Sequence, residues 1–371
     1  MHSTRRAFLG SCSAAAIAAA LPWSPARASR RAIAWIDIAD MPIEGRAFRD
    51  TKAPFDRLPL RAEGVVREEV WNLSRNSAGM SLRFATASPE VRVRYRLSSK
   101  TIALAHMPAT GVSGVDLYGH DGERWRWLSV SRPSKQDVEA TLLEGIPARE
   151  TPRSFWLYLP LYNGVEKMEI GVEEGFDVTP LPPRAKEQKP IVFYGTSIMH
   201  GACASRAGMA WPSIVGRALD REVFNFGFSG NGRMEKEVAQ HLCEIDAAAF
   251  VVDCLPNMTA QLVAERAGPL AQQLRAARKD APILFVEDRT FASAWFDEKR
   301  KRDHEQRRKE LRAAVAKLKE DGMQGVHLLS GEGLIGHDDE GTTDGSHPND
   351  LGMMRQADTV LAALRPLLAP R

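Results

Sequence analysis

The sequence predicts an α/β fold, a parallel sheet covered by helices on both faces, preceded by an all-β sandwich. Two patterns predict it. Between residues 62 and 175, short segments such as "VRVRYRL" (91–97) alternate apolar and charged residues, which is typical of half-buried strands. From residue 191 onward, short apolar runs alternate with stretches of helical periodicity, which is typical of a parallel sheet with three layers. The proline-rich run 176–190 separates the two patterns and is expected to be a linker.

The first residues of the chain have the order of an export signal. Arg5 and Arg6 precede a weakly apolar, alanine-rich stretch over 13–21, and small residues follow up to Ala28. Paired arginines are typical of the Tat route, and the apolar stretch is too short for a stable membrane span. We expect residues 1–28 to be a Tat-type signal peptide and the protein to be periplasmic or extracellular. The alternative is an uncleaved membrane anchor.

Charge and cysteine content exclude several classes of function. The chain holds 50 Lys and Arg against 47 Asp and Glu, a formal charge of +3. The expected signal contains three arginines and no acid, so the remainder is balanced and has no basic excess for nucleic acid or anionic membranes. No later segment is apolar enough for an integral membrane span. Beyond Cys12, the residues Cys203, Cys243 and Cys254 have no zinc-binding spacing, so we expect free thiols, no metal and no cofactor.

The expected sandwich domain covers residues 30–175. Turn signals such as Asp121-Gly122 and Asn163-Gly164 separate its apolar segments. Its aromatic residues could stack on sugar rings or pack in the core; they include Trp125, Trp127, Trp156 and Tyr158. Strands are expected at 80–86, 91–97, 125–130, 155–161 and 165–172.

The expected catalytic domain covers residues 191–371. Its helices are expected within 211–220, 234–245, 262–277, 303–322 and 350–368, the third interrupted at Pro269. Its strands are expected near 191–194, 223–227, 248–254, 282–288 and 326–330. In such sheets, ligands bind beyond the carboxyl ends of the strands.

Polar residues follow four of these strands. Ser197 follows the first, Gly230 the second and Asn257 the third, while Asp344 and His347 follow the last. Acyl transfer needs these groups. His347 would take the proton of Ser197, and Asp344 would hold the imidazole in the required tautomer. The backbone N–H groups of Ser197 and Gly230, with the Asn257 amide, could stabilise an oxyanion.

Four segments resemble, in order, the blocks of the SGNH (GDSL-type) hydrolases: "YGTSI", "NFGFSG", "DCLPN" and "DGSHP". The stretch "SGVDLYGHDG" (113–122) resembles the GxDLY signature of a β-sandwich domain that precedes such hydrolases. The resemblance implies a flavodoxin-like catalytic domain without a cofactor. It also implies Ser197 as nucleophile, Asp344 and His347 as its triad partners, and Gly230 and Asn257 in the oxyanion hole. The first block reads Gly-Thr-Ser instead of Gly-Asp-Ser, and the third has Leu-Pro instead of a glycine before its asparagine.

Other polar residues are candidates for lesser roles. Glu287 and Arg289 follow the fourth strand, where they could contact substrate or form a structural ion pair. Asp338 and Asp339 are alternatives to Asp344 as the triad acid.

We therefore expect a secreted serine esterase that hydrolyses short-chain esters, acetyl above all, on carbohydrates. Export implies envelope or environmental substrates, either small molecules or polysaccharide esters. No long apolar insertion suggests a lid for long acyl chains. Related enzymes, by the resemblance, include carbohydrate acetylesterases. The alternatives are a lipase or thioesterase acting on longer chains, and a noncatalytic glycan-binding protein.

Overall fold

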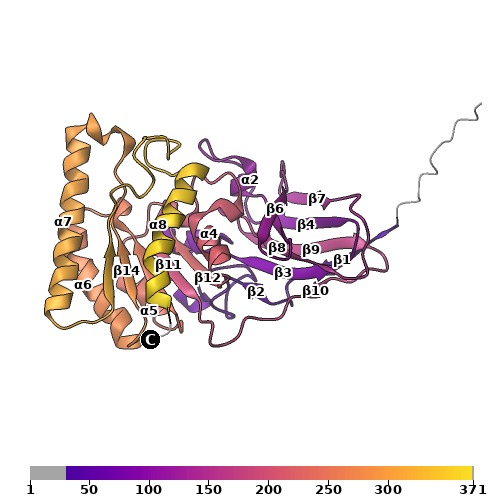
Figure 1. Cartoon of the computed structure of the whole chain (residues 1–371), viewed down its shortest axis with the longest axis horizontal. Helices are drawn as coiled ribbons and strands as arrows, with labels where there is room; N and C mark the ends of the chain where they lie inside the picture. The colour runs from indigo at the N-terminus through magenta and orange to yellow at the C-terminus, as the bar shows by residue number, and fades with distance from the viewer. Residues whose placement is uncertain (1–30, 370–371) are drawn as a thin grey trace, which may run out of the picture. The chain divides into compact units, whose positions relative to one another are not determined.

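The structure is a computed structural model that describes residues 31–369 (Figure 1). The expected signal peptide, 1–28, lies outside the described residues. From Ile33 onward the chain clusters into one compact unit. Within 31–369, no helix has the length and apolar character needed to cross a membrane.

Two antiparallel sheets form the N-terminal part. The first has the strand order β1-β9-β4-β7, and the second has the order β10-β3-β8-β5-β6, with β2 paired to β3. Strands β4 and β6 have the predicted bounds. The strands are β1 (Ile33–Asp37), β2 (Ile43–Glu44), β3 (Ser81–Thr86), β4 (Val91–Leu97), β5 (Asp116–His120), β6 (Trp125–Val130), β7 (Asp137–Leu143), β8 (Arg153–Tyr158), β9 (Val165–Glu173) and β10 (Thr179–Pro180).

The two sheets share one apolar core, as expected for a sandwich. Phe84 of β3 and Phe155 of β8 stack at 5.4 Å between ring centroids, and they pack in the same cluster as Val93 and Tyr95 of β4. The alternation in "VRVRYRL" thus separates a buried face from a charged one. The linker prediction for 176–190 needs one correction, because β10 lies within it and pairs with β3.

The C-terminal part contains a five-stranded parallel sheet. Its order, β12-β11-β13-β14-β15, is the 2-1-3-4-5 order of flavodoxin-like folds. The order reverses beside β11, so the loops after β11 and β13 border the crevice where such folds bind ligands. The strands are β11 (Ile191–Gly195), β12 (Val223–Gly227), β13 (Ala249–Asp253), β14 (Ile283–Val286) and β15 (Val326–Leu329).

Helices contact both faces of this sheet (Figure 1). Ile191 and Phe193 of β11 pack in one apolar cluster with α4 and α8, whereas Val192 and Tyr194 pack in another with α5, α6 and α7. The helices in these clusters are α4 (Trp211–Ala218), α5 (Lys236–Leu242), α6 (Ala260–Ala277), α7 (Glu298–Glu320) and α8 (Asp350–Leu368). The other helices are η1 (Leu60–Ala62), α1 (Glu68–Ser74), α2 (Ala109–Val112), α3 (Ser197–His200), η2 (Ala207–Met209), η3 (Leu255–Asn257) and η4 (Ala292–Trp295).

The predicted interruption at Pro269 is wrong, because α6 continues through it. Proline removes the hydrogen bond to the carbonyl four residues earlier. Here both Pro269 and Glu265 are exposed, so water can satisfy the Glu265 carbonyl.

The aspartate of the GxDLY signature joins the sandwich to the catalytic part. Asp116 is fully buried and accepts hydrogen bonds from Trp127 Nε1, Arg206 Nη1 and Gly208 N, each at 2.8 Å. Burial raises the pKa of Asp116, and Arg206 opposes that rise. The signature therefore anchors the segment that follows α3, the helix that Ser197 begins.

Candidate active site

Ser197 lies where β11 ends. It is the first residue of α3, and Thr196 caps that helix by accepting a hydrogen bond from Ile198 N. Because Ser197 is the first residue of α3, its backbone N–H has no acceptor within that helix. A Cβ atom added at Gly195 would lie only 2.7 Å from the Asp253 carbonyl oxygen, so glycine permits the tight turn at this position. The strand-end serine is thus held at the carboxyl edge of the sheet.

Three predicted side chains form a continuous hydrogen-bonded chain. Ser197 Oγ lies 2.9 Å from His347 Nε2, and His347 Nδ1 lies 2.7 Å from Asp344 Oδ2. The second carboxylate oxygen of Asp344 accepts hydrogen bonds from the backbone N–H groups of Ser346 and His347. This one turn fixes the acid and the imidazole together.

The Asp344 carboxyl is held in its ionised form. Burial alone would raise its pKa, but hydrogen bonds from the backbone and ring of His347 outweigh it and lower the pKa to about 2. The alternative acid Asp338 instead pairs with Arg355 at 2.7 Å. Of these two carboxylates, Asp344 is therefore the one that contacts the imidazole.

Gly230 and Asn257 belong to neighbouring loops that meet beside the start of α3. Asn257 Oδ1 accepts a hydrogen bond from Gly232 N at 3.3 Å, which leaves the amide nitrogen without a partner among the described residues. Gly230 has a left-handed φ of 71°, a conformation that favours glycine. Gly232 lies so close to β11 that a Cβ atom added to it would be 2.1 Å from the Gly195 carbonyl oxygen. The loop of Asn257 thus contacts the loop that carries Gly230, and that loop lies against the end of β11.

The Leu-Pro pair that replaces a glycine before the asparagine of the third block has a structural explanation. Pro256 lies in the first turn of η3, where a missing N–H breaks no helical hydrogen bond. The turn ends with Asn257, whose N–H bonds to the Cys254 carbonyl at 3.1 Å. Proline and asparagine are therefore compatible in this loop.

Glu287 and Arg289 both make internal contacts. Glu287 is fully buried and forms an ion pair with Arg312, the structural alternative considered for it. Arg289 donates from Nε to the Ser346 carbonyl at 2.6 Å and from Nη2 to Ser346 Oγ at 2.9 Å. It therefore holds the turn that carries His347.

Comparisons with known proteins match both parts of the chain. The model of the GDSL-like lipase/acylhydrolase family matches residues 188–365, and the model of the N-terminus of SGNH-hydrolase-type esterases matches residues 33–178. A crystal structure described as a GDSL-like lipase from Bacteroides ovatus ATCC 8483 is 30% identical, with a TM-score of 0.86, covering 91% of this chain and 98% of that one. The chain belongs to the GDSL-like lipase/acylhydrolase family.

More distant structures share the fold of this GDSL-like hydrolase. A salicylyl-acyltransferase from a tetracycline biosynthetic pathway is 18% identical, with a TM-score of 0.70, covering 90% of this chain and 97% of that one. An acetyl xylan esterase from the rumen bacterium Butyrivibrio proteoclasticus is 12% identical, with a TM-score of 0.56 and coverages of 90% and 98%. The search of curated proteins found no match.

The sandwich of this GDSL-like hydrolase also reaches the candidate site, which the sequence did not reveal. The exposed ring of His106 lies 5.6 Å from that of His347, measured between centroids. Tyr162 donates a hydrogen bond to the Ser197 carbonyl at 3.3 Å and stacks on His200 at 4.2 Å. Neither residue lies in a recognisable motif, so only the folded chain brings them here.

The sandwich aromatics considered as sugar platforms are mostly engaged elsewhere. Trp156 and Tyr158 are buried and stack on each other at 5.3 Å. Trp127 is half exposed, but its indole N–H donates a hydrogen bond to Asp116. The guanidinium group of Arg206 also covers the Trp127 ring. Core packing, the alternative use of such rings, accounts for Trp156 and Tyr158.

Three groups near Ser197 have the chemistry of metal ligands. Cys203, Asp344 and His347 each offer an atom within 4.8 Å of the others. Burial raises the pKa of the Cys203 thiol to about 11, so it is protonated near neutral pH. Asp344 and His347 are already hydrogen-bonded to each other. Cys203, Cys243 and Cys254 are all free thiols.

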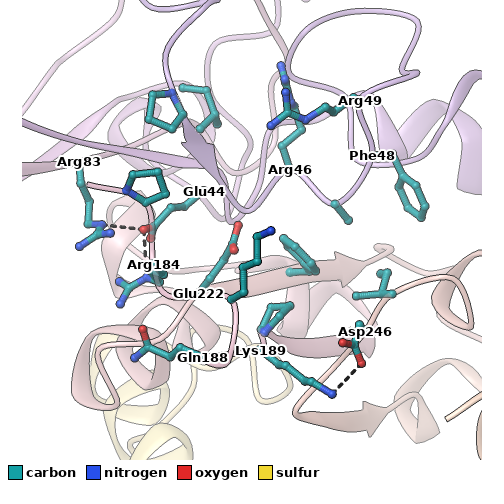
Figure 2. Close-up of a pocket in the computed structure, with 18 of the residues that line it drawn as sticks. Glu44, Arg46, Phe48, Arg49, Arg83, Arg184, Gln188, Lys189, Glu222 and Asp246 are labelled. Atoms are coloured by element: carbon teal, nitrogen blue, oxygen red, sulfur yellow. Dashed lines mark hydrogen bonds and ion pairs between the residues drawn. The ribbon is translucent and has the colours of Figure 1, made fainter. Parts of the chain in front are cut away.

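A groove of about 1130 Å³ lies at the opposite, amino-terminal edge of the GDSL-like hydrolase sheet (Figure 2). Arg83 and Arg184 both donate to Glu44, at 2.6 and 3.0 Å. Glu222, just before β12, also lines it, and burial raises its pKa to about 7. The groove is thus separated from Ser197 by the length of the strands.

Proposed function

We propose that this protein is an exported serine esterase that removes small acyl groups, acetyl above all, from carbohydrates. The observation that carries the proposal is the hydrogen-bonded chain from Ser197 Oγ through His347 to Asp344. A hydroxyl, an imidazole and an ionised carboxylate in this order are what nucleophilic acyl transfer requires.

In the first half of the reaction, Ser197 Oγ attacks the ester carbonyl as His347 Nε2 takes its proton. Asp344 holds the imidazole in the correct tautomer and stabilises the imidazolium. The oxyanion accepts hydrogen bonds from the N–H groups of Ser197 and Gly230 and from the Asn257 amide. The carbon–oxygen bond then breaks, and the alcohol leaves with the proton that His347 held.

In the second half, water attacks the acyl group on Ser197. His347 takes a proton from that water, the same donors stabilise the second oxyanion, and the carboxylic acid leaves as Ser197 recovers its proton. Apart from water, side chains and backbone groups of the chain take every role in this cycle.

Two observations support a small acyl group on a bulky alcohol. The side chains of Asp344 and His347 are 39% and 25% exposed, so the candidate site is open at one side, as a polymeric substrate requires. His106 and Tyr162 from the sandwich lie next to His347 and Ser197. The fold shared with an acetyl xylan esterase also favours a carbohydrate ester.

The test compares esters of increasing chain length with acetylated glycans. We expect the enzyme to hydrolyse p-nitrophenyl acetate and butyrate, to lose activity steeply beyond butyrate, and to release acetate from acetylated xylan or mannan. Ser197→Ala should abolish turnover, whereas Ser213→Ala, which removes an unpaired hydroxyl in α4, should not. A preference for octanoate without acetate release would indicate a lipolytic enzyme, and inactivity toward all esters a noncatalytic protein.

Export through the Tat route is the second part of the proposal. It is supported by Arg5 and Arg6 ahead of the weakly apolar stretch. Replacing both with lysine should leave the enzyme in the cytoplasm, as measured by cell fractionation and esterase assay. Unchanged export of this variant would contradict the Tat assignment.

A further inference from the structure

Two adjacent aromatic side chains stand out among the described residues by their exposure. Trp295 is 77% and Phe296 79% exposed, whereas the next most exposed large apolar side chain, Met354, reaches 53%. Their rings contact each other edge to face at 5.6 Å. Exposed aromatic groups of this kind commonly mark a binding surface.

These side chains lie on the same edge of the sheet as Ser197. Helix η4, which ends at Trp295, follows β14, and the carboxyl ends of parallel strands share one edge. Ala292 N donates to the Gly345 carbonyl at 3.0 Å, directly within the turn that holds Asp344 and His347. The aromatic segment is therefore continuous with the candidate active site.

The segment is anchored beneath its exposed rings. The Phe291 ring contacts His304 at 5.0 Å between centroids, and the Arg300 guanidinium lies 4.7 Å from its centre. Asp297 caps α7 by accepting a hydrogen bond from Arg300 N at 3.0 Å. These contacts hold η4 in place while leaving Trp295 uncovered.

Trp295 borders a hollow of about 210 Å³. Phe291 and Trp295 line this hollow, and so does the loop 331–342, which contributes His337 and Asp339. Within residues 31–369, Asp339 makes no hydrogen bond or ion pair, so its carboxylate can accept hydrogen bonds from sugar hydroxyl groups. Phe296 does not line the hollow.

We propose that this hollow is a substrate subsite that binds one pyranose ring of the acylated glycan. The apolar face of the sugar stacks on Trp295, and its hydroxyls bond to Asp339 and His337. A pyranose has this combination of one apolar face and a polar rim, and binding pockets commonly pair aromatic walls with a few polar groups. An acyl chain would leave the polar wall unpaired, which disfavours a lipid. The inference rests on the proposed function and extends it to the positioning of the carbohydrate.

Binding can be tested apart from catalysis. Isothermal titration of the Ser197→Ala protein with unacetylated xylo-, manno- and cello-oligosaccharides measures sugar affinity directly. Adding Trp295→Ala should weaken the binding of the preferred oligosaccharide about tenfold, and Trp295→Phe should weaken it less. Phe296→Ala is the matched control, because it removes an equally exposed ring outside the hollow, and should leave affinity unchanged.

Kinetics supply the second measurement. In the active enzyme, Trp295→Ala should raise KM for an acetylated oligosaccharide about tenfold, and it should raise KM for p-nitrophenyl acetate much less, because that ester carries no sugar ring. Equal effects of Trp295→Ala and Phe296→Ala, or no loss of sugar affinity, would overturn the subsite. Inactivity toward every ester would instead refute the proposed esterase, even if Trp295-dependent sugar binding persisted.

Discussion

Arg57, from the segment between β2 and β3, donates a hydrogen bond from Nη1 to the Gly227 carbonyl at the end of β12, at 2.8 Å. The same nitrogen reaches the Asn225 carbonyl at 2.9 Å, and the remaining nitrogens bond to the carbonyls of Leu73 and Asn76. The side chain is buried, and burial lowers its pKa to about 9. A cation satisfied by backbone carbonyls thus ties the N-terminal part to the strand that leads to Gly230.

We predict that Arg57→Met destabilises the protein and also slows the reaction. The substitution leaves several buried carbonyls without a donor, which should lower the free energy of unfolding by about 3 kcal/mol. The loop carrying Gly230 should lose its support, so kcat should fall more than KM rises. Urea unfolding and steady-state kinetics measure the two effects. Arg96→Met, which removes a half-exposed arginine from the sandwich surface, is the control, and equal behaviour of the two variants would contradict the role of Arg57.

The identity of the triad acid can be tested by comparing substitutions of Asp344 and Asp338. Asp344→Asn should lower kcat by about four orders of magnitude, because an amide favours the wrong tautomer of His347. Asp338→Asn should leave kcat nearly unchanged, because Asp338 pairs with Arg355 at the surface. Measurement of kcat for p-nitrophenyl acetate decides between them. If Asp338→Asn is the more damaging change, Asp344 is not the triad acid.

The amide of Asn257 should act mainly in the transition state. Asn257→Ala should lower kcat by about 10²- to 10³-fold with little change in KM, because an oxyanion donor stabilises charge that the ester substrate does not carry. Asn231→Ala is a nearby control, since the Asn231 side chain bonds to Arg67 and the Ser229 carbonyl instead. A rise in KM with unchanged kcat would assign Asn257 to substrate binding.

Local patterns predicted the strands and long helices of the catalytic part and the order of the candidate site residues, but they missed sandwich strands such as β5 and β7. Apolar runs, helical periodicity and turn residues are all read from neighbouring positions in the sequence. The strand at 223–227 and the helix at 350–368 therefore have their predicted bounds. Arg57 and Gly227, by contrast, are 170 residues apart, and no local pattern pairs them. Periodicity also could not show which aromatic side chains are covered, and Trp156 is buried while Trp295 is exposed.

A buried carboxyl group beside the site makes stability depend on pH. Asp253, the last residue of β13, accepts a hydrogen bond from Gln356 Nε2 at 3.1 Å. Burial raises its pKa to about 7, although the nearby Arg289 opposes the rise. In the unfolded chain, the pKa of an aspartate is about 3.9. Between these values the folded protein holds a proton that the unfolded chain has released, so stability decreases as pH rises toward 7.

We predict that Asp253→Asn removes this loss of stability, because an amide cannot ionise. The variant should gain about 2 kcal/mol in unfolding free energy relative to wild type between pH 5 and pH 8, with most of the gain below pH 7. Urea unfolding at several pH values measures it. Asp338→Asn is the control, because Arg355 holds the pKa of Asp338 at about 2 and its carboxyl stays ionised in both states across this range. Parallel stability curves for Asp253→Asn and wild type would show that Asp253 is already ionised at pH 5 in the folded protein.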